Sequence, residues 1–404
     1  MRETAYWVWL QQALGAGAPQ GAALLKAFDS IEEVYAASAY PSTVELSPKQ
    51  RRALQNKSLD TAERELEILQ SLDGFLIIPG DEEYETLFEG MYAPPVMLYG
   101  RGTRFDPCDV PRVAVVGTRH HDDSGVLVTR RLSAGLAAGG AVVVSGGAEG
   151  LDCEALCAAM DAGGRCLSFQ ACGIDVEYPR ATQFMRERLL ASGGMLLSEF
   201  PMGSKAYGYH FPIRNRLIAG CTLGTLVTEA PLKSGALMTA KWAREQGRDV
   251  FVAPGPVGVE SAAGSNELLK DGATPVTAAA DILMTYALRY PFAIDIEAAV
   301  EAEEHAAALL HDERNDRAPL SPLPARTVLS VAQPPEETVP VPCPETASDE
   351  AKAVYAALLS GGQTAAELSR STALPLSRVL TALTMLELGG TVRCTAGQRY
   401  ELLS

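Results

Sequence analysis

One stretch decides the fold of this chain: Ala141-Val142-Val143-Val144-Ser145-Gly146-Gly147-Ala148-Glu149-Gly150-Leu151-Asp152. Its first five residues are almost continuously apolar, which is typical of a strand buried on both faces of a parallel sheet. Three glycines then provide a tight turn, and a helical pattern follows at 153–162. The stretch therefore predicts a strand–loop–helix unit with its glycine loop at the carboxyl end of a parallel strand.

The same alternation continues on both sides of this stretch. Apolar strands are expected at 112–116, 141–145, 165–170, 195–198, 222–228 and 249–253. Helices are expected at 124–138, 153–162, 181–191, 215–220 and 235–246. Strands that alternate with helices form a parallel sheet with helices on both faces. The sequence therefore predicts an α/β fold, a Rossmann-like doubly wound parallel sheet, in residues 73–290.

Three segments flank this domain. Residues 1–72 carry apolar side chains at helical spacing and predict a small helical domain, similar to sterile-alpha-motif or helix-hairpin-helix modules. Residues 291–347 are acidic and then proline-rich, which is typical of a linker, and we expect the proline-rich half to be disordered. Residues 348–404 predict three helices and a hairpin, the pattern of a winged helix. Its low lysine and arginine content favours a protein contact, and a weak duplex-DNA contact is the alternative.

The net charge of −16 over 404 residues argues against a general polyanion binder. However, residues 291–350 hold 13 acidic and 3 basic residues, so the folded part is only mildly acidic and can form a local basic groove. There is no apolar run long enough for a bilayer and no secretory signal pattern. The eight cysteines are scattered without metal-ligand spacing. We expect a cytoplasmic protein with reduced thiols, no metal and no membrane contact.

Glycine-bearing loops at 116–119, 145–152 and 233–240 are expected at the same edge of the sheet. Glycine lets a backbone approach a phosphate, and the helix that follows presents free N–H groups. The run His210-Phe211-Pro212-Ile213-Arg214-Asn215-Arg216 enters a helix close to that edge. Arginine suits phosphate, and the phenylalanine offers a stacking surface for a base. This combination, together with Arg119, indicates a nucleic-acid site.

Several enzyme classes lack their motifs here. There is no GxxxxGK[ST] loop, no GxGxxG loop and no convincing nucleophile–base pair, so neither catalytic residues nor a cofactor are expected. Glu199 and Glu229 end strands, and we expect them to hydrogen-bond a base edge or the glycine-rich backbone.

Two rival functions stay open. Residues 223–229 faintly resemble the PGGxGTxxE loop of nucleotide phosphoribohydrolases, although the spacing to Glu229 is one residue too long and the PGG is absent. The other rival is a nucleotide-sensing module whose winged helix binds promoter DNA.

Eight motifs occur in the order and spacing of the DNA-processing protein A family (DprA, also called Smf), which the chain resembles most strongly over 75–290. The motifs are Val116–Arg119, Ser145–Asp152, Tyr178-Pro179, Ser198-Glu199, Phe211–Arg216, Glu229-Ala230, Ser234-Gly235 with Thr239-Ala240, and Pro254-Gly255. The resemblance implies a non-enzymatic protein that binds single-stranded DNA in natural transformation, protects incoming strands and loads the RecA recombinase. It also implies a homodimer built through the Rossmann-like domain.

The resemblance further implies a single-stranded-DNA site. In it, Gly117 and Arg119 hold phosphate, Ser145 and Gly146 offer backbone donors, Phe211 stacks on a base, Arg214 and Arg216 line the groove, Asn215 orients the loop, and Ser234 with Gly235 closes the pocket. Thr118, Gly147, Lys205 and Lys233 complete the expected set. Family members often carry a lysine just before the Phe-Pro pair. Here Lys205 is the nearest, and Tyr207 and Tyr209 intervene, either as stacking or as packing residues.

Overall fold

The computed structural model describes residues 2–316, 348–359, 361, 363–389, 391–395 and 399–402. The chain divides into two compact units, Met1–Ala318 and Pro319–Ser404, which are described separately. The proline-rich half of the predicted linker lies outside the described residues, so its expected disorder stays a prediction. No helix in the described ranges is long and apolar enough to cross a membrane.

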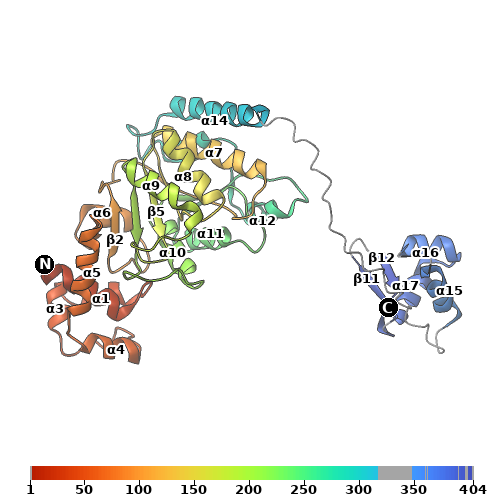
Figure 1. Cartoon of the computed structure of the whole chain (residues 1–404), viewed down its shortest axis with the longest axis horizontal. Helices are drawn as coiled ribbons and strands as arrows, with labels where there is room; N and C mark the ends of the chain where they lie inside the picture. Colours follow the sequence, from red (N-terminus) through yellow and green to blue (C-terminus); the bar gives the residue numbers. More distant parts are fainter. Residues whose placement is uncertain are drawn as a thin grey trace, which may run out of the picture. The chain divides into compact units, whose positions relative to one another are not determined.

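The first unit, which runs from α1 to α14 in Figure 1, is built on a sheet of nine strands in the order β1-β2-β6-β5-β4-β3-β7-β8-β9. All neighbours from β6 to β9 are parallel, while β1 and β2 are antiparallel additions at one edge. The strands are β1 (Phe75–Ile77), β2 (Leu98–Gly102), β3 (Arg112–Val116), β4 (Val142–Ser145), β5 (Cys166–Gln170), β6 (Met195–Ser198), β7 (Gly224–Val227), β8 (Asp249–Val252) and β9 (Thr274–Pro275). This confirms the predicted Rossmann-like doubly wound fold.

Helices cover both faces of the sheet. Alternate residues of a strand enter opposite cores: Val113 and Val115 face one core, whereas Ala114 and Val116 face the other. Because both faces are buried, the strands read as continuous apolar runs in the sequence. The helices of this domain are α6 (Glu82–Phe88), α7 (Asp123–Ala138), α8 (Leu151–Asp161), α9 (Gln183–Ala191), α10 (His210–Gly220), α11 (Gly235–Glu245), α12 (Ala263–Lys270), α13 (Ala279–Tyr286) and α14 (Ile296–Asp316), with 3₁₀ turns at Arg180–Thr182 and Glu260–Ala262.

The winding direction reverses between β3 and β7. From β3 the chain passes through α7, α8 and α9 to reach β6, and α10 then returns it to β7, on the other side of β3. From there α11 and α12 lead outward to β9. In open α/β sheets, ligands bind in the crevice at the carboxyl ends of the strands, at such a reversal.

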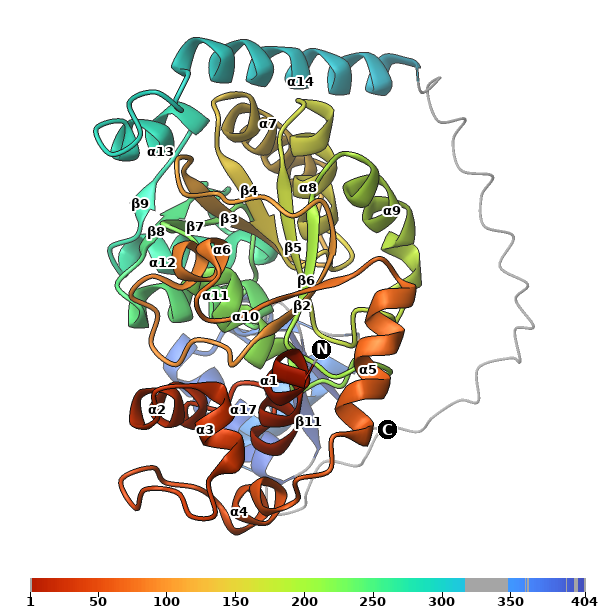
Figure 2. The ribbon, with the colours of Figure 1, turned by 90° about the vertical axis from the view of Figure 1, so that its left-hand side faces the viewer.

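The predicted N-terminal helical domain contains α1 (Arg2–Leu14), α2 (Gln20–Ala27), α3 (Ile31–Ala36), α4 (Pro48–Gln55) and α5 (Asp60–Ser71). Figure 2 shows these helices gathered beneath the β2 and β6 side of the sheet. The Gln11 side chain donates a hydrogen bond to the Glu199 carbonyl at 2.7 Å. Buried Glu65 accepts hydrogen bonds from Tyr99, Gln12 and the Met202 amide. The helical domain is thus bonded directly to the segment after β6.

Helix α14 lies within the segment predicted to be a linker. It packs along α7 (Figure 2), where close approach is possible because Gly135 of α7 faces Glu303 and Gly139, directly after α7, lies against Ala299. Its Glu303 side chain is buried and forms an ion pair with Arg131 at 2.8 Å. The acidic half of the predicted linker therefore includes a helix of the first unit.

The second unit contains α15 (Asp349–Leu358), α16 (Ala365–Thr372) and α17 (Leu376–Leu388), together with β10 (Gln363–Thr364), β11 (Val392–Thr395) and β12 (Arg399–Leu402). The strands pair in the order β10-β12-β11. Val354, Leu368 and Leu383 contribute to a small buried core. Three helices and a hairpin confirm the predicted winged helix.

Candidate functional site

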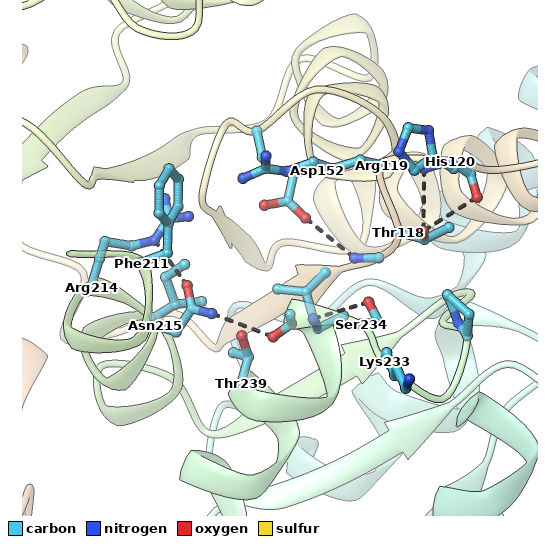
Figure 3. Close-up of a pocket in the computed structure, with 17 residues that line it drawn as sticks. Thr118, Arg119, His120, Asp152, Phe211, Arg214, Asn215, Lys233, Ser234 and Thr239 are labelled. Atoms are coloured by element: carbon cyan, nitrogen blue, oxygen red, sulfur yellow. Dashed lines mark hydrogen bonds between the residues drawn. The ribbon is translucent and has the colours of Figure 1, made fainter. Parts of the chain in front are cut away.

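A cavity of about 280 Å³ lies at the reversal point between β3 and β7 (Figure 3). Its walls come from the loop after β3, the start of α8, the outer face of α10 and the loop that leads into α11. The residues that line it are Val116, Gly117, Thr118, Arg119, His120, Ala148, Asp152, Phe211, Arg214, Asn215, Ile218, Pro231, Lys233, Ser234, Gly235, Ala236 and Thr239. The fold thus brings together most of the predicted site residues.

The loop after β3 is fixed beside the cavity by backbone hydrogen bonds. The Gly117 amide donates to Asp152 Oδ1 at 3.2 Å, and the Thr118 amide donates to the Glu229 carbonyl at 2.8 Å. A Cβ at Gly117 would lie 2.7 Å from Leu151, so a side chain cannot be added without a shift. Arg119 follows as an exposed side chain on a fixed loop, which leaves its guanidinium available to a ligand.

The loop after β4 is fixed by contacts with the neighbouring strand β3 and with Arg214 of α10. The Ser145 hydroxyl is buried and donates to the Val115 carbonyl at 2.6 Å, so this side chain links two strands. A Cβ at Gly146 would lie 2.4 Å from Nη1 of Arg214, so the guanidinium packs directly against this glycine. Gly147 has φ +58°, a left-handed conformation that favours glycine. The predicted glycines are therefore required by close approach and by backbone conformation.

Arg214 is the central buried cation of the site. Its Nη1 donates to the carbonyls of Gly146, at 2.6 Å, and Phe169, and its Nε donates to Asn215 Oδ1 at 3.0 Å. Burial lowers the pKa of Arg214 to about 10, while the nearby Asp152 carboxylate acts in the opposite direction, so the group stays charged at neutral pH. Arg214 thus fixes the glycine loop while it lends positive charge to the cavity.

Arg216 is placed differently from the prediction, and the expectation that it lines the groove is corrected. Its Nη2 lies 2.6 Å from both carboxylate oxygens of Glu199, and its Nη1 donates to the Ala93 carbonyl. Both charged side chains are buried. Residues two apart on a helix point about 200° away from each other, so Arg214 and Arg216 cannot share one face. Glu199 is accordingly the partner of Arg216, and the expectation that it contacts a base edge or the glycine loop is corrected as well.

The third loop closes the cavity at the start of α11. The Ser234 hydroxyl accepts a hydrogen bond from the Ala236 amide at 3.2 Å and so caps the helix. Asn215 Nδ2 donates to the Gly235 carbonyl at 3.4 Å, which ties α10 to α11. Lys233 is exposed at the rim. The N-terminus of α11 therefore faces the cavity beside an exposed cation, an arrangement suited to an anion.

Phe211 separates the cavity from a smaller neighbour of about 90 Å³, and its ring lines both. The Arg119 guanidinium lies over this ring, 5.1 Å from its centroid, and Tyr178 meets it edge-on at 6.2 Å. Gly146 and Gln170 line the second cavity. An aromatic ring and an exposed cation are thus stacked where two hollows meet.

Sequence reasoning missed several lining residues, of which Asp152 is the most informative. It is buried, and burial raises the pKa of its carboxyl group, while Arg214 and the Gly117 amide counteract this effect. Its place at the start of α8, directly after a glycine loop, is the signal that could have found it. Lys205, by contrast, is exposed and lines neither cavity. Glu229 is buried against Gly125 of α7 and is not among the lining residues.

Comparison with known proteins shows the family of this chain. The sequence profile of DNA recombination-mediator protein A matches residues 75–287, and that of the DprA winged helix domain matches 334–398. Protein Smf from Synechocystis sp. is 31% identical over 99% of this chain and 98% of its own length.

Two solved structures are also similar. DNA processing protein A from Streptococcus pneumoniae superposes with a TM-score of 0.55 at 28% identity, covering 70% of this chain and 97% of that one. DNA processing protein A from Helicobacter pylori, whose structure concerns its single-stranded DNA binding mode, gives a TM-score of 0.48 at 29% identity, covering 54% and 98%. The profile match over more than half of the chain and the full-length likeness to Smf lead to one conclusion: this chain belongs to the DNA recombination-mediator protein A family and is a DNA-processing protein.

Proposed function

We propose that the protein binds single-stranded DNA at the cavity between β3 and β7 and acts, without catalysis, as a recombination mediator. In this role it protects incoming strands during natural transformation and loads RecA onto them. The observation that carries the proposal is the stack of exposed Arg119 on Phe211 at the junction of two cavities. A phosphate-binding cation and a base-sized aromatic surface are the two parts that single-strand binders combine.

The mechanism follows from the charges around the cavity. Arg119 and Lys233 are exposed cations on opposite walls, and buried Arg214 adds positive charge from below. We infer that a strand draws the Arg119 guanidinium from the ring to a phosphate, and that a base then takes its place on Phe211. The N–H groups at the start of α11 donate hydrogen bonds to a second phosphate. Phosphate contacts carry no sequence information, so little base preference is expected.

The phosphoribohydrolase-like alternative receives less support from the geometry. That reading needs the Glu229 carboxylate in the ligand cavity, whereas the structure places it against Gly125, outside the lining. Asp152 does line the cavity, but it is bonded to Gly117 and lies near Arg214. A nucleotide hydrolysis assay distinguishes the readings, and we expect no product.

The central test is a fluorescence anisotropy titration of oligo-dT and of a duplex of equal length, at two salt concentrations. We expect the single strand to bind more tightly, and its affinity to fall with salt because phosphate contacts release counterions. Arg119→Ala and Lys233→Ala should each weaken binding and reduce the salt dependence. Lys241→Ala is the matched control, since it removes an exposed cation from α11 away from the cavity. Equal losses in all three variants would overturn this assignment of the groove.

We also propose that the protein is a homodimer through the Rossmann-like domain. Leu288 and Phe292 are fully exposed just after α13, and Met284 of α13 is exposed as well. A cluster of large apolar side chains marks an interaction surface. Light scattering over a range of concentrations should show a dimer in the wild type and a monomer in Leu288→Glu/Phe292→Glu. An unchanged dimer would exclude this surface.

RecA loading needs a separate test. RecA assembly on single strands that are already coated with single-strand-binding protein should be faster when the protein is added, and the Arg119→Ala/Lys233→Ala variant should remove the gain.

The winged helix is proposed to contact protein, because Leu380 and Met385 are exposed on α17 and Arg378 is paired with Glu350. Unaltered duplex affinity after removal of residues 348–404 would agree with this role.

A further inference from the structure

Two tyrosine rings stack on each other close to the cavity, in the segment between β6 and α10. The rings of Tyr207 and Tyr209 lie 5.7 Å apart between centroids, with their planes inclined by only 6°. Tyr207 is 50% exposed and Tyr209 66% exposed. Because the rings are parallel and in contact with each other, their outer faces account for much of this apolar exposure.

A buried histidine supports the pair from beneath. His210 meets Tyr207 edge-on at 5.3 Å and Tyr209 at 4.5 Å, both nearly perpendicular. The imidazole is stacked on Phe200 at 4.1 Å, and its Nδ1 is 3.0 Å from the Ala171 carbonyl. The exposed rings therefore pack on buried aromatic side chains, so they lose little conformational freedom when a ligand stacks on them.

The loop that carries the pair is also held at its start. The Asp175 carboxylate accepts a hydrogen bond from the Gly203 amide at 2.8 Å, and the Ser204 carbonyl accepts one from the Gly173 amide at 2.8 Å. Lys205 follows as an exposed cation two residues before Tyr207. A cation and two aromatic rings thus stand together on a braced loop.

The pair lies within reach of the proposed base site. Tyr209 precedes Phe211 by two residues, so their Cα atoms are at most about 7 Å apart, although their side chains point in different directions. His210, which supports the pair, has its Nδ1 3.0 Å from the Ala171 carbonyl, and Ala171 lines the smaller cavity together with Phe211. A strand with one base on Phe211 therefore has a neighbouring nucleotide near the tyrosines. Aromatic rings stack on any base, because every base has a π-face. Tyrosine also keeps its hydroxyl in water while the ring makes apolar contact.

We infer that Tyr207 and Tyr209 form a second base-stacking station, which takes the nucleotide next to the one at Phe211. This inference rests on the proposed single-stranded-DNA binding. The incoming base stacks on an outer face of the pair, because the two rings already contact each other, and Lys205 meets the adjoining phosphate.

The test compares three variants by anisotropy with oligo-dT and with a strand of equal length whose central sugars lack bases. Tyr207→Ala/Tyr209→Ala should bind oligo-dT about tenfold more weakly than wild type. Tyr207→Phe/Tyr209→Phe keeps the rings and should bind within about twofold of wild type. Tyr92→Ala, which removes an exposed tyrosine from the segment between α6 and β2, is the matched control. The base-free strand should bind the wild type and the double alanine variant equally.

A second readout does not depend on affinity. An oligonucleotide that carries 5-iododeoxyuridine should cross-link on irradiation to Tyr207 or Tyr209, as located by mass spectrometry. If wild type fails to bind oligo-dT, the proposed function itself is wrong. If wild type binds and Phe211→Ala weakens binding, but the double alanine variant binds normally and neither tyrosine cross-links, only the second station is overturned. A double phenylalanine variant as weak as the double alanine variant would likewise exclude stacking.

Discussion

Arg216 and Glu199 form a buried ion pair in which one guanidinium nitrogen lies 2.6 Å from both carboxylate oxygens. The pair joins α10, which carries Arg216, to the chain directly after β6, where Glu199 lies. Removing one partner leaves an uncompensated buried charge, which typically costs about 3–5 kcal/mol. We therefore expect Arg216→Ala to lower the free energy of unfolding by about that amount in a urea titration. Oligo-dT affinity of the folded protein should change little, since Arg216 lies away from the cavity. A variant as stable as wild type that no longer binds DNA would contradict this assignment.

The close contact between Gly146 and Arg214 leads to a second prediction, which compares two glycine substitutions. Gly146→Ala forces a methyl group against the guanidinium that holds the loop, and overpacking of this kind costs about 1–3 kcal/mol. It should also weaken oligo-dT binding, because Arg214 and the loop move together. Gly235→Ala has open space and should leave stability within about 0.5 kcal/mol of wild type. Thermal unfolding and anisotropy check both, and equal behaviour of the two variants would refute the steric argument.

The buried carboxyl group of Asp152 predicts that binding depends on pH. Burial raises the pKa of Asp152, so protonation removes a negative charge from the cavity at a pH above the usual carboxyl range. A nearby phosphate favours that protonated form, and oligo-dT affinity should therefore rise as the pH falls from neutral toward the usual carboxyl range. The folded pKa of Asp152 lies above its unfolded pKa, so between these two values the folded state binds more protons. The contribution of Asp152 to the free energy of unfolding therefore decreases as the pH rises through this range.

Asp152→Asn keeps an acceptor for the Gly117 amide and should flatten the pH dependence of binding. The comparison is repeated in a His120→Ala background, because His120 also lines the cavity. An unchanged slope in Asp152→Asn would assign the effect to another group.

The packing of α14 on α7 predicts where the first unit can be cut. A chain ending at Ala318 retains buried Ala299 and Glu303, and it should unfold cooperatively near the wild-type temperature. A chain ending at Tyr290 uncovers the glycine face of α7 and leaves Arg131 without its carboxylate partner. Its unfolding midpoint should fall by at least about 5 °C. Differential scanning calorimetry distinguishes the two, and equal midpoints would show that α14 adds no stability.

The sequence predicts the sheet well because its strands are buried on both faces. Residues such as Val142–Ser145 leave little doubt between strand and helix, and glycine loops mark the strand ends. The direction in which a helical side chain points is harder to predict. Arg214 and Arg216 belong to one motif, yet the helix places them on different faces, and this depends on how α10 packs on the sheet. Asp152 was missed because a carboxylate beside phosphate-binding loops conflicts with simple charge matching. The acidic composition around Glu303 hid a helix that is stabilised by tertiary contacts.

The bonds from Glu65 and Gln11 to the segment after β6 have a practical consequence. The Met202 amide donates to a carboxylate of α5 at 3.4 Å, so its hydrogen should exchange with solvent more readily when the N-terminal helices separate from the sheet. Its exchange rate thus reports, from within the native chain, how often these two parts come apart. If a bound DNA strand stabilises the contact between the N-terminal helices and the segment after β6, it should slow this exchange. The effect should appear even though the DNA touches no residue of the N-terminal helices.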